Sequence, residues 1–134
     1  MFKVVRDKVP MLFERHHGYA PEALLETYKR FGNTAIFKRD KLKEETEEFL
    51  TEVLEGHVNN AYEEASDVFE ALICCLVEID PRLEIEDVES KLLNSINVKR
   101  EKYGRMSGDH IVKITEDEKR HYYNNLKGKV NDEF

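Results

Sequence analysis

The sequence predicts an all-α protein, a helical bundle built on an antiparallel helical hairpin and completed by oligomerisation. Apolar residues recur at helical spacing through three long segments, and glycine and proline fall between these segments. No run of alternating apolar and polar residues indicates a β-sheet. A chain of 134 residues, 40% of them apolar, is long enough for a single modest core.

Two short helices are expected near the N-terminus. The first covers about residues 7–16, with Asp7 as its N-cap, Pro10 tolerated in its first turn and Gly18 after its end. The second covers about residues 22–30 and lies between a proline and a glycine.

Three long helices follow, over about residues 34–55, 58–79 and 85–103. Gly56 separates the first two, and Asp80-Pro81 ends the second. The residues that recur at helical spacing are Leu42, Thr46, Phe49, Leu50, Val53 and Leu54 in the first helix, Val58, Ala61, Tyr62, Ala65, Val68 and Phe69 in the second, and Val88, Leu92, Leu93, Ile96 and Val98 in the third. These residues are expected to face inward.

The second half of the middle helix, residues 71–77, is apolar on every side. Such a helix is expected to be buried on every side, which a small chain achieves most easily by packing against another copy. Cys74 and Cys75 lie in this run and are interpreted as core thiols in a reducing compartment. We expect one domain over residues 1–114, with a short extended segment at 110–114, and a charged tail or weak helix over 115–134.

Charge excludes some classes of partner. The net charge of −7 disfavours binding to polymeric nucleic acid. No segment is long and apolar enough for a membrane span and no secretion signal is recognisable, so a cytoplasmic protein is expected.

Residues 40–90 carry 17 acidic and three basic residues, whereas the net charge of the two flanks together is +7. This asymmetry is consistent with a metal site beside phosphate-binding arms, and also with ordinary solvated helix faces.

Each of the two hairpin helices carries a pair of acidic residues three positions apart, Glu45 with Glu48 and Glu64 with Asp67. Glu45 and Asp67 are each 11 residues from Gly56, and Glu48 and Glu64 are each eight residues from it. An antiparallel hairpin therefore places four carboxylates at one height, where they repel one another unless a hard cation such as Mg²⁺ binds. We expect this site at the rim of the hairpin or against another helix, not in a dry core.

Basic residues in the two flanks are candidate phosphate ligands. They are Arg6, Lys8, Lys99, Arg100, Lys102 and Arg105. Basic residues at the end of a helix also complement its dipole, which is an alternative explanation for residues 99–102. No glycine-rich phosphate loop and no serine or cysteine nucleophile motif is present.

Two motifs carry a family resemblance: Glu44-Glu45-x-x-Glu48, followed after 15 residues by Glu64-x-x-Asp67, and the opening Val4-Val5-Arg6-Asp7-Lys8-Val9-Pro10. Over about residues 2–106 the chain resembles the all-α NTP pyrophosphatase superfamily, the MazG-like proteins, which include phosphoribosyl-ATP pyrophosphohydrolase. The opening motif is similar to that of a small MazG-like subgroup.

The resemblance implies Mg²⁺-dependent hydrolysis of a nucleoside triphosphate between the α- and β-phosphates, giving the monophosphate and pyrophosphate, with Mn²⁺ as a substitute metal. It implies a metal held by Glu45, Glu48, Glu64 and Asp67, and Glu44 is our candidate general base. It implies phosphate contacts from Arg6, Lys8, Lys99, Lys102 and Arg105, and a homodimer or a dimer of dimers.

Two alternatives stay open. One is a non-catalytic helical dimerisation or regulatory module that still binds a nucleotide, motivated by the apolar run at residues 71–77. The other is a phosphoribosyl-ATP pyrophosphohydrolase. The sequence does not indicate which base or sugar is accepted.

Overall fold

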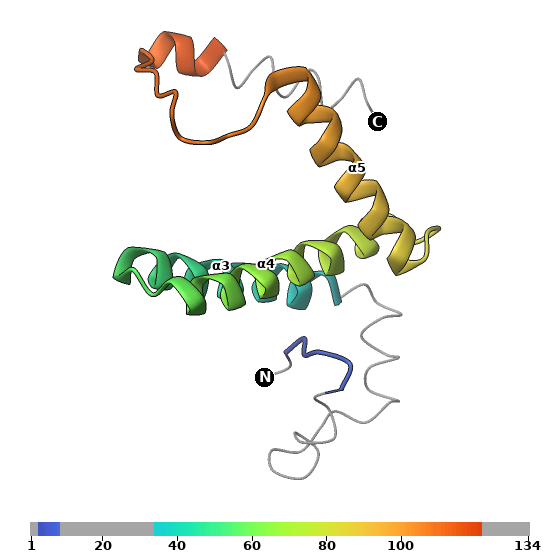
Figure 1. Ribbon diagram of the computed structural model, residues 1–134. Helices are drawn as coiled ribbons and strands as arrows, with labels where there is room; N and C mark the ends of the chain where they lie inside the picture. Colours follow the sequence, from blue (N-terminus) through green and yellow to red (C-terminus); the bar gives the residue numbers. More distant parts are fainter. Residues whose placement is uncertain (1–2, 9–33, 122–134) are drawn as a thin grey trace. The chain divides into compact units, whose positions relative to one another are not determined.

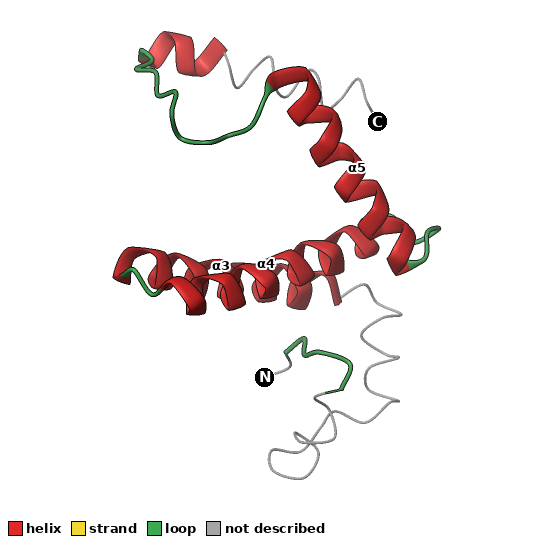
Figure 2. Ribbon diagram, viewed as in Figure 1, coloured by secondary structure: helices red, strands yellow, loops and turns green. Residues whose placement is uncertain are grey.

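The computed structural model describes residues 3–8 and 34–121 (Figure 1). These residues form three long helices, α3 (Thr34–Glu55), α4 (Val58–Ile79) and α5 (Ile85–Tyr103), and a further helix begins at residue 116. Figure 2 shows helices and loops, and no strand, in this part of the chain. The all-α prediction is confirmed, and the three long helices have the predicted bounds. The helices predicted over 7–16 and 22–30 fall outside the described residues, apart from positions 7 and 8, which form a turn.

Helices α3 and α4 lie side by side as an antiparallel hairpin (Figure 1). Gly56 has a φ of 74° and ends α3 in the left-handed region, which is natural for glycine. The backbone N–H of His57 donates to the carbonyl of Glu52 at 3.0 Å, and that of Gly56 to the carbonyl of Val53 at 3.2 Å. This pair of bonds is a Schellman motif, which satisfies carbonyls at the end of α3 and turns the chain into α4.

Polar contacts join α3 and α4 at the end of the hairpin opposite the turn. Lys38 Nζ of α3 lies 2.7 Å from Glu78 Oε2 of α4, and the Thr34 hydroxyl donates to Glu78 Oε1 at 3.2 Å. The hydrogen bond from Lys38 holds the pKa of Glu78 below its ordinary value. Past the end of α4, Lys91 of α5 pairs with Asp80 at 3.1 Å.

The buried apolar residues of the described chain are Ala71 and Ile73 of α4 and Val88 of α5. Residues 71–77 are not buried on every side within the single chain, because Leu72 is exposed and residues 74–77 are half-buried, and burial of this run against another copy stays a prediction. Each helix of a pair covers only one side of the other, so the far side of α4 stays uncovered.

The expected apolar stripes are also exposed near the hairpin turn in the single chain. Leu50, Val53 and Leu54 of α3 and Val58 and Tyr62 of α4 are each at least half exposed. In α5, Leu93 and Val98 are exposed as well. The stripes have the helical period that the sequence predicts, but no element of the described chain covers them at this end.

The chain divides into two compact units, Met1–Asn97 and Val98–Phe134. The predicted domain of residues 1–114 therefore spans the first unit and part of the second. In the second unit, the Gly104 N–H donates to the Arg100 carbonyl at 2.8 Å and α5 ends. Residues 110–115 have no regular secondary structure. None of the helices that the structure describes combines the length and apolarity needed to cross a membrane.

Candidate metal centre

Five carboxylates of α3 and α4 meet at mid-height of the hairpin, and we refer to them as the carboxylate cluster: Glu44, Glu45, Glu48, Glu64 and Asp67. One oxygen each of Glu44, Glu45 and Glu48 lie within 4.8 Å of one another, and so do oxygens of Glu45, Glu64 and Asp67. Glu45 belongs to both groups and links the two helices. The structure thus brings together the residues that the spacing about Gly56 predicts.

Glu45 is the buried member of the cluster, with 6% of its surface exposed. Its Oε1 lies 2.8 Å from Lys41 Nζ, one helical turn earlier. Its Oε2 and the Oε2 of Glu64 are buried and accept no hydrogen bond from the described residues. A buried carboxylate oxygen without a partner is costly, and a cation is the partner that this charge favours.

Glu48 lies at the exposed side of the cluster. Partial desolvation, together with hydrogen bonding and charge repulsion from Glu45 and Glu64, raises the pKa of Glu48 to about 7. A pKa this high indicates that the cations near Glu48 do not neutralise all of the negative charge around it. Since Glu64 and Asp67 are half-buried, the cluster runs from buried Glu45 to the surface, as expected for a site at the rim of the hairpin.

The N-terminal segment, residues 3–8, supplies two cations to the cluster. Lys3 Nζ lies 2.5 Å from Glu44 Oε1 on α3, and Arg6 forms an ion pair with Asp67 on α4. The hydrogen bonds to these carboxylates raise the pKa of Lys3 and of Arg6. Arg6 was predicted as a phosphate ligand, whereas in this structure its partner is a carboxylate.

Lys3 and Lys41 were not predicted as site residues. Lys41 was detectable, because a lysine four residues before Glu45 lies on the same helix face. Lys3 carried no such signal, since it lies 41 residues from Glu44 in the chain.

The remaining predicted phosphate ligands have separate surroundings. Lys8 is exposed in a turn of the N-terminal segment. Lys99, Lys102 and Arg105 are exposed and belong to the second unit, where Lys102 Nζ lies 5.2 Å from the centre of the Tyr103 ring. Lys102 lies in the last turn of α5, where a cation complements the helix dipole. Their role at phosphate stays a prediction.

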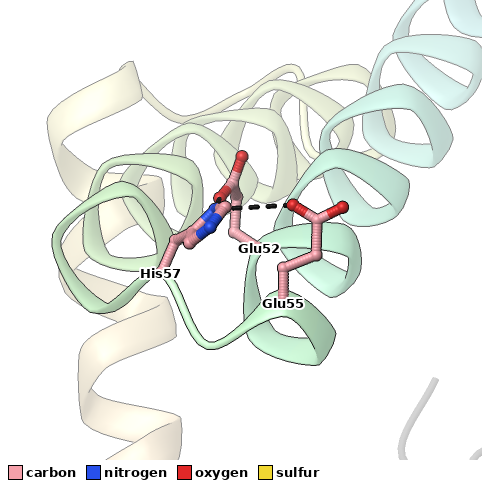
Figure 3. A group of neighbouring side chains, drawn as sticks. All are labelled: Glu52, Glu55 and His57. Carbon is pink, nitrogen blue, oxygen red and sulfur yellow. Dashed lines mark hydrogen bonds and ion pairs between the residues drawn. The ribbon is translucent and has the colours of Figure 1, made fainter.

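A second group of possible metal ligands, Glu52, Glu55 and His57, lies at the hairpin turn (Figure 3). His57 Nδ1 is 2.8 Å from Glu52 Oε2 and 3.4 Å from Glu55 Oε2. All three side chains are partly or largely exposed, so water satisfies their remaining polar atoms. The contacts within the group account for its geometry without a metal.

An apolar groove of about 350 Å³ opens beside this turn, and we refer to it as the turn groove. Its apolar lining is Phe49, Val53, Val58, Ala61, Tyr62 and Ala65, and Glu52, Gly56 and His57 complete the lining. Several of these residues are the exposed apolar positions described above.

Comparison of the chain with protein-family models, with curated proteins and with solved structures found no match in any of the three. The choice among functions therefore depends on the cluster itself. Its donor set consists of carboxylate oxygens only, which is the chemistry that Mg²⁺ and Mn²⁺ prefer.

Proposed function

We propose that the protein is a Mg²⁺-dependent nucleoside triphosphate pyrophosphohydrolase that cleaves between the α- and β-phosphates. The observation that carries this proposal is the pair of buried, unpartnered oxygens of Glu45 and Glu64 inside a cluster of five carboxylates. The chain keeps these charges close together although they repel one another. A bound divalent cation is the simplest reason for retaining them.

Glu45, Glu48, Glu64 and Asp67 would hold the metal. When bound, the metal neutralises charge on phosphate oxygens and lowers the pKa of a coordinated water. Glu44, four residues before Glu48 and half-buried, is the proposed general base that accepts the proton of the attacking water. Mn²⁺ is expected to substitute for Mg²⁺.

A nucleotide substrate is proposed on two grounds. The acidic signature and the opening motif resemble those of the MazG-like proteins, and the basic flanks suit a polyphosphate. The proposed phosphate ligands are those that the resemblance implies, most of them from across a dimer interface: Arg6, Lys8, Lys99, Lys102 and Arg105. A small anionic ligand is also consistent with a protein whose net charge of −7 disfavours nucleic-acid polymers.

The proposed assembly is a homodimer or a dimer of dimers in the cytoplasm. The exposed apolar residues at the hairpin turn support self-association, because large exposed apolar patches are typical of interfaces. Cys74 and Cys75 are free thiols, which agrees with a reducing compartment.

The test is a panel of canonical and modified NTPs and dNTPs, with Mg²⁺ present, monitored by release of pyrophosphate. Asp67→Asn and Glu48→Gln are expected to reduce the rate by about 100-fold or more, since even groups that only support a metal ligand cost 10- to 100-fold. Glu63→Gln is the matched control, because Glu63 is an exposed acid next to Glu64 and lies outside the cluster.

A folded protein that releases no pyrophosphate from any member of the panel would rule the proposal out. Activity on phosphoribosyl-ATP but not on simple triphosphates would select a phosphoribosyl-ATP pyrophosphohydrolase instead. A rise in melting temperature with one nucleotide, only when Mg²⁺ is present, would identify the substrate class independently of turnover. Nucleotide binding without turnover, unaffected by Asp67→Asn, would favour the non-catalytic module.

A further inference from the structure

The N-terminal segment engages both sides of the carboxylate cluster at once. Lys3 reaches Glu44 on α3, and Arg6, three residues later, reaches Asp67 on α4. Between them lie Val4 and Val5, which are half-buried. The two cations of this segment therefore act on the hairpin as a pair.

The partners of these two cations are the residues that the proposed reaction needs free. Asp67 is a proposed metal ligand, and Glu44 is the proposed base. Arg6 also interacts electrostatically with Glu45, and Lys3 with Glu45 and Glu48. A divalent cation among these carboxylates would repel both side chains, because charges of the same sign would then lie a few ångström apart.

The two ion pairs are placed so that they can open. The side chains of Lys3 and Arg6 are 50% and 56% exposed, and ion pairs with this exposure are weak because water competes for both partners. The pair of Lys41 with Glu45 differs, since the Glu45 side chain is only 7% exposed. Lys41, whose side chain is 20% exposed, is therefore the more firmly held counter-ion of the cluster, and Lys3 and Arg6 are the more easily displaced ones.

We propose that residues 3–8 form a cation clamp that exchanges with the metal: Lys3 and Arg6 neutralise Glu44 and Asp67 in the metal-free protein and leave these carboxylates when a divalent cation binds. This inference rests on the proposed function for the identity of the site. It adds that metal entry removes the closer of the two cations beside Glu44, which leaves only Lys41 at 3.8 Å, and releases Arg6 toward the phosphates. The clamp thereby links metal binding to the completion of the phosphate site.

The test is the binding of Mn²⁺ alone to the full chain, measured from the paramagnetic resonance signal of the free ion. Arg6→Gln removes a competing cation, so it is expected to tighten Mn²⁺ binding about two- to fivefold, the range that an exposed ion pair supports. Lys8→Gln is the matched control, because it removes the same charge from the same segment at a residue outside the two ion pairs. Lys3→Gln is expected to act in the same direction as Arg6→Gln.

A second measurement follows the clamp directly. Trypsin cleaves after Arg6, and Mn²⁺ is expected to accelerate this cleavage about two- to fivefold, while cleavage after Lys119 of the second unit serves as the internal reference.

The results separate the two proposals. Mn²⁺ binding that is the same in Arg6→Gln and Lys8→Gln, or weaker in Arg6→Gln, would overturn the clamp and leave the metal site intact. If the wild type binds no Mn²⁺ and Lys3→Gln or Arg6→Gln does, the two cations exclude the metal completely, which supports the clamp. Absence of Mn²⁺ binding in every variant, with circular dichroism showing folded protein, would overturn both the clamp and the metal-dependent function.

Discussion

Glu45 of α3 and Glu64 of α4 approach each other across the hairpin, and each has one buried carboxylate oxygen without a hydrogen-bond partner among the described residues. Their partial burial distinguishes them from an ordinary acidic helix face, where water solvates every oxygen. The hairpin therefore carries electrostatic repulsion at a point where water solvates the carboxylates only in part.

Glu64→Gln is expected to stabilise the metal-free protein. The substitution keeps the shape of the side chain and removes one of the charges that repel Glu45 and Glu48, so a gain of about 1 kcal/mol is expected. This corresponds to a rise in melting temperature of roughly 4 °C in EDTA. Glu63→Gln on the same helix is the control and is expected to change the melting temperature little. A lower melting temperature for Glu64→Gln would show that the cluster is stabilising without a cation.

The raised pKa of Glu48 predicts that stability depends on pH in a particular direction. The folded protein keeps a proton on Glu48 up to about pH 7, whereas the unfolded chain releases it near 4.5. Between these values the folded state binds more protons, so the stability of the metal-free protein falls as pH rises through this window. Because Glu48 is exposed, its contribution is expected to be below about 1 kcal/mol.

Melting temperatures measured in EDTA from pH 5 to 8.5 check this prediction. Glu48→Gln is expected to lessen the decline, and Glu47→Gln, an exposed neighbour outside the cluster, is expected to leave it unchanged. Parallel curves for the wild type and Glu48→Gln would contradict a raised pKa at this position.

The helix bounds and the register of the carboxylates were predictable because both depend on local signals. Glycine and proline mark the ends of α3, α4 and α5, and the distances of Glu45 and Asp67 from Gly56 determine which carboxylates meet. An antiparallel pair with a tight turn leaves little freedom in register.

Burial and the ion pairs of the N-terminal segment were less predictable because they depend on contacts distant in sequence. The periodicity of Leu54 and Tyr62 predicts an apolar face, but does not say whether anything covers it. The ion pair of Lys3 with Glu44 requires knowledge of how residues 3–8 approach the hairpin, and the two residues are 41 positions apart in the chain. The chemical roles of Glu44 and the cluster stay predictions.

Gly56→Ala is expected to destabilise the hairpin by about 1 kcal/mol. The φ of 74° is unfavourable for alanine, although a Cβ at this position would contact no atom within 4 Å. Gly56→Asn is expected to cost less, because asparagine adopts the left-handed conformation more readily. Urea unfolding of the two variants compares them directly, and equal losses for Ala and Asn would indicate a cause other than backbone conformation.

Val53→Lys is expected to shift the protein toward monomer if the turn groove is part of the proposed dimer interface. Val53 lines the groove and is 51% exposed in the single chain, so a lysine there causes no burial of charge within one copy. In a dimer it would place a charge inside an apolar contact, which costs several kcal/mol when unpaired. Sedimentation velocity measures the change, and Val98→Lys, equally exposed on α5 and outside the groove, is the control. A wild-type protein that sediments as a monomer at high micromolar concentration would contradict the proposed assembly. A dimer that is unchanged in Val53→Lys would show that the interface lies outside the turn groove.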